Sequence, residues 1–285
     1  MLRLDGRQND QLRPISIVYE GLDRVDGSAR FSLGTSSSLV SVSGPIEVRP
    51  AAELPSQAAL EVSIRPLAGL PGTDSKALSS ILKSILSSFL LLSQHPRTLV
   101  QVVCQALSGN ETGSGSGSAG RGWNASLIAS LVNASTAALL SASSVPMNGV
   151  VCAVAVGRLA NPKASQSTLI LDPSEAELPL LAGGGCFAFL ISSTLPSQNK
   201  NPSDSDIPPV SLIWTNYTAV GPLFDVSELA EAQRLAEVGA VEVWRKLKES
   251  IRHIGQRDVE ASLVKNERPS ALLEEKGDDE AAMEI

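Results

Sequence analysis

The order of strand-like and helix-like segments is the feature that most limits how this chain can fold. A helical pattern at 74–93 is followed by a strand-like segment at 98–107. Before them the chain has a run of segments with roughly alternating apolar and polar residues, at 15–20, 28–33, 38–43 and 57–65. Because the strands come in a run and do not alternate regularly with helices, the order predicts the α+β class, with helices packed on a sheet.

The second half of the chain repeats this organisation. A helix is predicted at 125–143, and a long amphipathic helix at 226–254. Between them lie predicted strands at 149–157, 167–172, 185–192 and 210–216. Two polar insertions rich in Gly, Ser and Pro, 108–122 and 195–209, cannot bury a core. We therefore expect a single domain over 1–254, with flexible insertions and an acidic, disordered tail at 255–285.

Charge and cysteine usage limit the possible partners. The net charge is −7, of which −5 lies from Gly255 onward, so the body is nearly neutral. Such a body does not bind RNA or DNA by bulk electrostatics. The three cysteines lie in apolar runs and show no metal-binding spacing. The charged start of the chain and the lack of a long apolar run predict neither a signal peptide nor a membrane span.

A glycine-rich stretch between the strand at 98–107 and the following helix contains a G-x-G-x-x-G pattern, formed by Gly115, Gly117 and Gly120. A dinucleotide site needs a short turn and an acidic residue at the end of the next strand. Here the stretch is about fifteen residues long, and the next strand ends in Arg158. Alternating Gly and Ser is typical of a spacer, so we interpret the stretch as a flexible insertion.

Other candidate sites are equally weak on the residues alone. No G-x-S-x-G motif occurs, and His95 and His253 are the only histidines. The acidic cluster Asp172, Glu175 and Glu177 follows a predicted strand. It could hold Mg²⁺ or act in acid–base catalysis, or it could be a solvated turn. No active site emerges from these patterns, and a charge-poor, apolar body favours an interaction subunit.

Several segments in register carry a resemblance to a known family. Together they resemble the RNase PH-like ring subunits of the RNA exosome, over about residues 3–254. The segments are LDGRQNDQLRPI (4–15), DGSARFSLGTSSSLVSVSGPIEV (26–48), LEVSIRPLAGLPG (60–72), HPRT (95–98), VPMNGVVCAVAV (145–156) and LILDP (169–173). The most specific of them are the stretch at 60–72 and the HPRT turn.

The resemblance implies a fold, an assembly and a role. The fold would be the RNase PH-like domain, which is ribosomal-protein-S5-domain-2-like. Six such domains form a ring around an RNA channel, and cap subunits with S1 and KH domains sit on top. The expected partners are the other ring subunits, the caps and RNA in the channel, with no membrane. The expected role is 3′-to-5′ RNA processing and degradation, including rRNA processing and mRNA turnover, in the nucleus, nucleolus and cytoplasm.

The resemblance also implies that the catalytic site is degenerate. In phosphorolytic relatives an Asp-Gly-Gly-Thr-Arg turn holds phosphate; here Trp123 stands where its Arg belongs. A second family arginine falls near Lys83, which loses the bidentate geometry of a guanidinium. Of the catalytic acids Asp172 and Glu175 remain, while Ala176 replaces the key Asp. These vestigial positions predict a non-catalytic subunit without a cofactor.

Two further expectations stay open. An active phosphate-dependent 3′-to-5′ exoribonuclease is the alternative, with Arg121 replacing the lost arginine and Asp172 or Glu175 supplying the acid. For the structural subunit, the basic residues Arg65 and Arg97 are candidate contacts along the RNA path.

Overall fold

The computed structural model describes residue 3 and residues 5–108, 124–159, 168–196, 207–219 and 224–266, with side chains described as far as 253. The chain separates into two compact units, Met1–Lys246 and Leu247–Ile285. Most of the two predicted insertions, with Trp123 and Arg121, lies outside the described residues, as does the chain beyond Asn266. The predicted strands and helices are confirmed in type and order.

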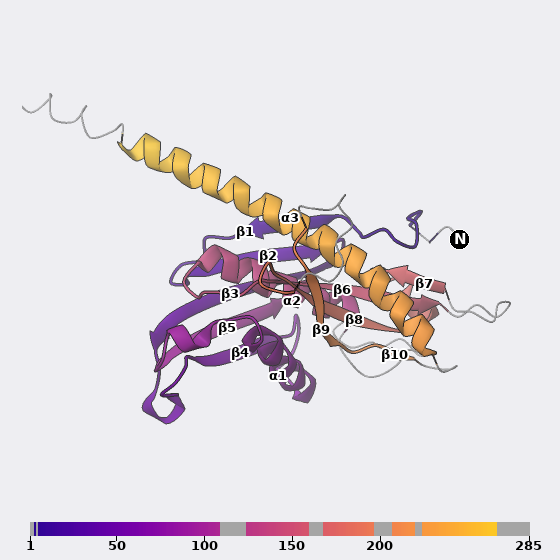
Figure 1. The fold of residues 1–285 in the computed structure, drawn as a ribbon, viewed down its shortest axis with the longest axis horizontal. Helices are drawn as coiled ribbons and strands as arrows, with labels where there is room; N and C mark the ends of the chain where they lie inside the picture. The colour runs from indigo at the N-terminus through magenta and orange to yellow at the C-terminus, as the bar shows by residue number, and fades with distance from the viewer. Residues whose placement is uncertain are drawn as a thin grey trace, which may run out of the picture. The chain divides into compact units, whose positions relative to one another are not determined.

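The first sheet takes its strands from the first half of the chain (Figure 1). They are β1 (Ile15–Tyr19), β2 (Gly27–Leu33), β3 (Ser36–Glu47), β4 (Ala59–Arg65) and β5 (Thr98–Ala106). The spatial order is β1-β2-β3-β5-β4, antiparallel except for the parallel pair β4–β5. The parallel pair needs a crossover, which α1 (Thr73–Ser87) provides. Along β5, every second residue from Val100 to Ala106 is buried, so one face of this sheet builds the core.

The second sheet comes from the second half of the chain. Its strands are β6 (Val150–Leu159), β7 (Thr168–Leu171), β8 (Leu181–Ile191), β9 (Val210–Thr215) and β10 (Thr218–Ala219). Their order is β10-β8-β6-β7, and β9 also pairs with β8. Residues Val151–Arg158 of β6 are all buried, unlike any strand of the first sheet. The second sheet is therefore covered on both faces at β6, whereas β3 and β5 of the first sheet alternate between buried and partly exposed residues.

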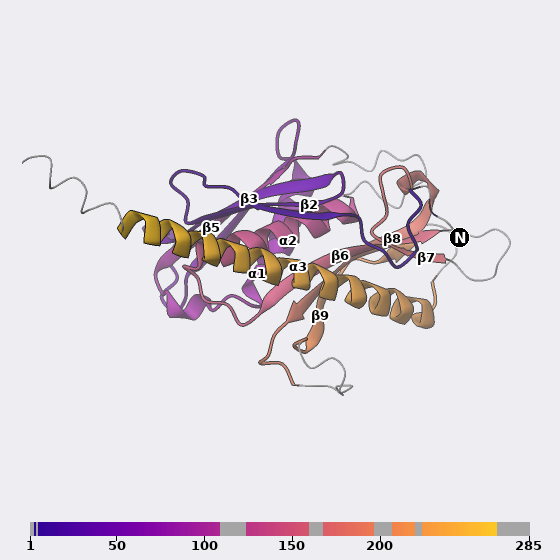
Figure 2. The same ribbon diagram turned by 90° about the horizontal axis from the view of Figure 1, so that it is seen from above.

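Helix α2 (Ala125–Ala142) lies between the two sheets and contacts strands of both, as Figures 1 and 2 show. Residues Ser126–Leu139 are all buried. The Asn133 side chain bonds both the N–H and the C=O of Ala153, at 2.7 and 2.8 Å, and so satisfies the free edge of β6. By length and composition α2 could cross a membrane, but its burial inside the protein identifies it as a core helix.

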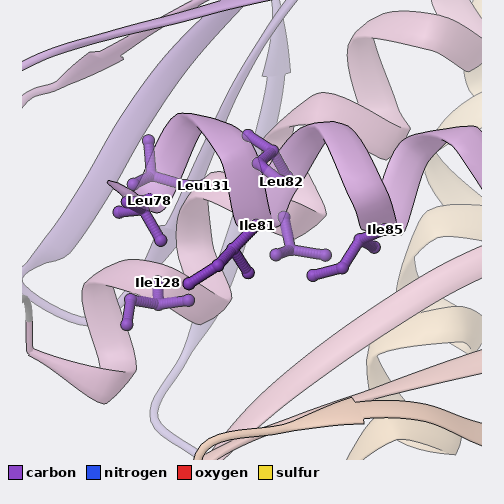
Figure 3. Close-up of a pocket in the computed structure, with 7 residues that line it drawn as sticks. Leu78, Ile81, Leu82, Ile85, Ile128 and Leu131 are labelled. Atoms are coloured by element: carbon purple, nitrogen blue, oxygen red, sulfur yellow. The ribbon is translucent and has the colours of Figure 1, made fainter. Parts of the chain in front are cut away.

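Helix α1 packs beside α2. Leu78, Leu82 and Ile85 on α1 face Ile128 and Leu131 on α2, around a small apolar pocket (Figure 3). The sequence predicted this helix to continue to Ser93, which is wrong: α1 ends at Ser87. The apolar spacing continues beyond that point, but the backbone there bonds to the segment before β6. The Asn148 N–H donates to the Phe89 carbonyl oxygen at 2.8 Å, for example.

Helix α3 (Val226–Asn266) is longer than predicted. In the first unit it packs on the second sheet, and a Cβ placed at Gly239 would lie 3.0 Å from the Leu171 side chain. The expected end near Ile254 is wrong, because the backbone remains helical to Asn266 and only then leaves the described residues. Residues with high helix propensity follow Gly255, and the first proline after Gly255 is Pro269, so the sequence allows the helix to continue.

Candidate functional site

The turn that follows β7 is where the resemblance places the catalytic acids, and there Asp172 is fully buried. Its backbone adopts a left-handed conformation with φ of 46°. The Nε and Nη2 atoms of Arg13 donate to the two carboxylate oxygens, each at 2.7 Å. The Arg13 backbone N–H adds a bond of 3.1 Å, and Ser126 Oγ donates at 3.2 Å. The carboxylate is thus held by a bidentate, charge-assisted pair.

The N-terminal segment supplies the cations for this turn. Arg3 donates to both oxygens of Glu177, at 2.8 and 2.6 Å, and to the carbonyl oxygens of Leu171 and Asp172. Arg7 donates to the Asp172 carbonyl oxygen at 3.1 Å. Residues 3–13 are therefore tied to the end of β7 by three arginines, and this arrangement fixes the turn.

These contacts decide what the acids can do. Both Asp172 oxygens are bound to a guanidinium and the side chain has no solvent exposure, so Asp172 serves as a structural anchor of the turn. The hydrogen bonds from Arg3 hold the pKa of Glu177 at about 2, against the opposing effect of burial. Glu177 is therefore ionised at neutral pH and cannot act as a general acid.

Glu175 behaves differently from its two neighbours. It is partly exposed, and among the described residues it makes no hydrogen bond or ion pair. The acidic cluster that the sequence indicated is therefore divided between two buried anchors and one partly exposed side chain.

No group of three or more His, Cys, Asp or Glu residues in the described part of the chain could hold a metal ion. The three cysteines are buried, and burial raises the pKa of the Cys104 thiol to about 12.

The amino-terminal end of α2 is the second part of the site. Asn124 caps the helix, and its Oδ1 accepts a hydrogen bond from the Ser126 N–H at 3.0 Å. Ser126 Oγ in turn donates to the Asp172 carboxylate. A phosphate at this helix end would need free N–H groups and nearby cations, whereas the described groups place oxygens there.

The basic residues predicted to contact phosphate or RNA are dispersed. Lys83 lies on the exposed side of α1 and makes no ion pair with any described residue. Arg65 ends β4 beside Gln105, whereas Arg97 lies just before the start of β5. Because β4 and β5 are parallel, the two arginines stand at opposite ends of the pair, about 25 Å apart along the strands. Arg97 also pairs with Glu53 at 3.3 Å.

A separate polar network secures the start of α3. Arg158 Nε on β6 lies 2.7 Å from Glu228 Oε1 on α3. The Tyr217 hydroxyl donates to the same oxygen at 3.0 Å, and its ring packs against Phe187 and Phe224. Burial and the Glu228 carboxylate raise the pKa of Tyr217. This network is structural and lies among residues that no predicted site includes.

Sequence reasoning missed the residues that organise the turn, namely Arg3, Arg7, Arg13, Ser126 and the anchoring role of Glu177. The available signal was the N-terminal segment itself. It carries three arginines in a chain with only 19% charged residues, and two of them, Arg7 and Arg13, lie within the first segment of the family resemblance. Buried carboxylates elsewhere in a charge-poor chain are the natural partners for such arginines.

Comparison with known proteins gives consistent matches. Residues 11–144 match the model of the 3′ exoribonuclease family, domain 1. The "Exosome complex exonuclease RRP46 homolog" of rice (Oryza sativa subsp. japonica) is 33% identical, over 72% of this chain and 75% of its own. The "Exosome complex component RRP46" of Saccharomyces cerevisiae is 30% identical, over 56% of this chain and 66% of its own.

The structural match agrees with the sequence matches. The crystal structure of rice Rrp46 superposes with a TM-score of 0.68 at 26% identity, and the match covers 88% of this chain and 100% of that one. A chain of the Archaeoglobus fulgidus exosome, from a structure with RNA bound to the active site, has the same fold, with a TM-score of 0.59 at 19% identity over 86% of this chain and 92% of that one. The chain described here therefore belongs to the RNase PH-like family of exosome subunits, together with the RRP46 homologues.

Proposed function

We propose that this chain is a non-catalytic ring subunit of the RNA exosome core. In this role it supports 3′-to-5′ RNA processing and degradation by scaffolding the ring and its RNA channel. The observation that carries the proposal is the Asp172 carboxylate, which is enclosed by Arg13 and Ser126 where phosphorolytic relatives place catalytic acids. The family membership supports the place in the ring.

The chemistry of the described residues supports the absence of catalysis. A phosphorolytic site needs an anion cradle and an ionisable acid. The α2 amino terminus is capped by Asn124 and faces a carboxylate, and Glu177 is held ionised by Arg3. Glu175 is the one acid of this turn without a bond to a described residue, so residual activity would depend on it.

The partners and localisation in this proposal follow from the family. We expect contacts with other RNase PH-like subunits, with cap subunits that carry S1 and KH domains, and with RNA in the channel. We expect the protein in the nucleus, the nucleolus and the cytoplasm. The wide separation of Arg65 and Arg97 gives no support to a joint RNA contact, so each remains a separate prediction.

Two measurements test the proposal. The purified chain, incubated with end-labelled RNA and inorganic phosphate, should release no nucleoside diphosphates, and co-expressed ring subunits should co-purify with it. Diphosphate release that disappears in Glu175→Gln would instead show an active phosphate-dependent exoribonuclease. Glu175→Gln is the informative variant, because Asp172→Asn would remove a structural anchor and so inactivate the protein for an unrelated reason.

A further inference from the structure

Helix α3 carries one row of basic side chains in its second half. Arg245, Lys248 and Arg252 are three and four residues apart, so they follow one another along the same side of this one helix. Arg245 and Arg252 are exposed, and Lys248 is partly exposed. We call these three residues the basic row. They belong to none of the sites described above.

The basic row lies on the side of α3 opposite to its buried side. The buried positions of the helix share one side and are Ala232, Ala236, Ala240, Val243 and Leu247. With 3.6 residues per turn, the basic row is centred about 150° around the helix axis from them. The three cations are therefore not part of the core, in contrast to Arg13 and Arg158, whose side chains are 7% and 6% exposed and pair with carboxylates.

The charge around the basic row is positive in a chain that is acidic as a whole. Residues 245–252 contain four basic residues and one acidic residue, a net charge of +3, whereas the whole chain has a net charge of −7. The acidic residue is Glu249, four positions after Arg245, and Glu242 lies three positions before Arg245. These two glutamates flank the row and weaken its potential, but they do not interrupt it. The second half of α3 thus gives this chain a local positive surface.

The spacing of the basic row fits a chain of phosphates. At a rise of about 1.5 Å per residue, Arg245 and Arg252 are about 10.5 Å apart along the helix axis, with Lys248 between them. Stacked nucleotides of one strand rise about 3.4 Å each, so the row covers about three phosphates. Two of its three residues are arginines, whose guanidinium group binds a phosphate through two parallel hydrogen bonds.

An aromatic side chain lies beside the basic row. Trp244 is partly exposed and precedes Lys248 by four residues, the spacing at which side chains on a helix are neighbours. Proteins that bind single-stranded nucleic acid combine cations with aromatic rings, because the phosphates meet the cations while bases stack on the rings. An acidic peptide would pair with the cations but would bring no base to the ring. The combination therefore favours RNA over an acidic protein segment.

We propose that the basic row and Trp244 form a contact site for single-stranded RNA on α3. The phosphates of about three nucleotides meet the three cations, and one base stacks on the indole ring. The choice of RNA rests on the proposed function, in which the assembly processes RNA, whereas the positive charge of the row does not depend on that function. The site uses neither the turn after β7 nor the predicted contacts Arg65 and Arg97.

The test measures binding of a short, fluorescently labelled oligouridylate to the full chain by anisotropy, at several salt concentrations. Three phosphate contacts predict a slope of about −2 when the logarithm of the association constant is plotted against that of the salt concentration. Arg245→Gln and Arg252→Gln should each reduce this slope by about 0.7 and weaken binding about 5-fold at about 0.1 M salt. Trp244→Leu should weaken binding at least about 5-fold and leave the slope unchanged.

Two variants of neighbouring residues serve as controls. Lys246→Gln removes the same charge directly beside Arg245 but on another side of the helix, so it should change the affinity by less than about 2-fold at about 0.15 M salt. Glu249→Gln removes a carboxylate that flanks the basic row, and it should tighten binding. Melting temperatures equal to that of the wild type would show that each variant is folded.

The outcomes separate this site from the proposed function. Equal weakening of RNA binding by Lys246→Gln and Arg245→Gln would show diffuse attraction and overturn the site. A poly-glutamate peptide that binds as tightly as the RNA, together with unchanged RNA binding by Trp244→Leu, would show that the partner is an acidic protein. If the chain co-purifies with ring subunits but binds no RNA through the basic row, this inference fails while the proposed function stands. If it binds RNA through the row but joins no ring subunits, the proposed function fails while the site stands.

Discussion

Two arginine–carboxylate contacts in this chain use the same chemistry in opposite surroundings. At the end of β7, the side chains of Arg13 and Asp172 are 7% and 0% exposed. Before β5, those of Arg97 and Glu53 are 70% and 36% exposed. Exposed pairs are screened by water and contribute about 0–1 kcal/mol, whereas removing one partner of a buried pair costs about 3–5 kcal/mol. At the turn after β7, Asp172 and Glu177 therefore hold the fold together.

The largest expected effect is at Asp172. Replacement by Asn leaves the buried Arg13 guanidinium without a counter-charge and should lower the free energy of unfolding by about 3–5 kcal/mol. Urea denaturation followed by circular dichroism measures this. Glu175→Gln is the matched control, three residues away and partly exposed, and it should change the unfolding free energy by less than about 0.5 kcal/mol. Equal urea midpoints for Asp172→Asn and Glu175→Gln would contradict the contrast between buried and exposed charges.

A slightly smaller effect, dependent on pH, is expected at Glu177. Its pKa is lowered from 4.5 to about 2, chiefly by Arg3, so its ionised form stabilises the folded state. That contribution, about 3 kcal/mol, is complete above pH 4.5 and is lost as the pH falls toward 2. The difference in unfolding free energy between wild type and Glu177→Gln should therefore shrink between pH 5 and pH 2 (about these limits). A difference independent of pH would show that the pair is not ionic.

An intermediate loss of unfolding free energy is expected in the network at the start of α3. Tyr217→Phe removes the hydroxyl that donates to Glu228 and keeps the ring contacts with Phe187 and Phe224. The loss should be about 1–2 kcal/mol, because Glu228 keeps its contact with Arg158. Thermal unfolding at neutral pH measures it. A loss as large as that of Asp172→Asn would place this network with the buried anchors.

The smallest effect is expected at the exposed pair. Glu53→Gln should change the unfolding free energy by less than about 0.5 kcal/mol, and even this difference should vanish in about 1 M salt because exposed charges are screened. Denaturation at low and high salt concentration checks this. A loss of more than about 1 kcal/mol that persists in salt would remove the distinction between the two kinds of pair.

The strands and helices could be predicted because their periodicity is local. The alternation along β5 and the helical spacing around Leu78 and Leu82 follow from which residues must face a core, whatever that core contains. Boundaries were less accurate where long-range contacts decide them. Helix α1 stops at Ser87 because the backbone beyond it pairs with the segment before β6, which no local pattern reveals.

The candidate site shows the same division between local and distant information. The sequence by itself determined the fold class and the order of elements, because these depend on residue identity and spacing along the chain. Only the tertiary structure decided that Asp172 meets Arg13 and that Glu177 meets Arg3. The Arg13–Asp172 and Arg3–Glu177 pairs join residues about 160–175 positions apart. Their protonation and energy depend on burial, which arises only when the two sheets close around α2.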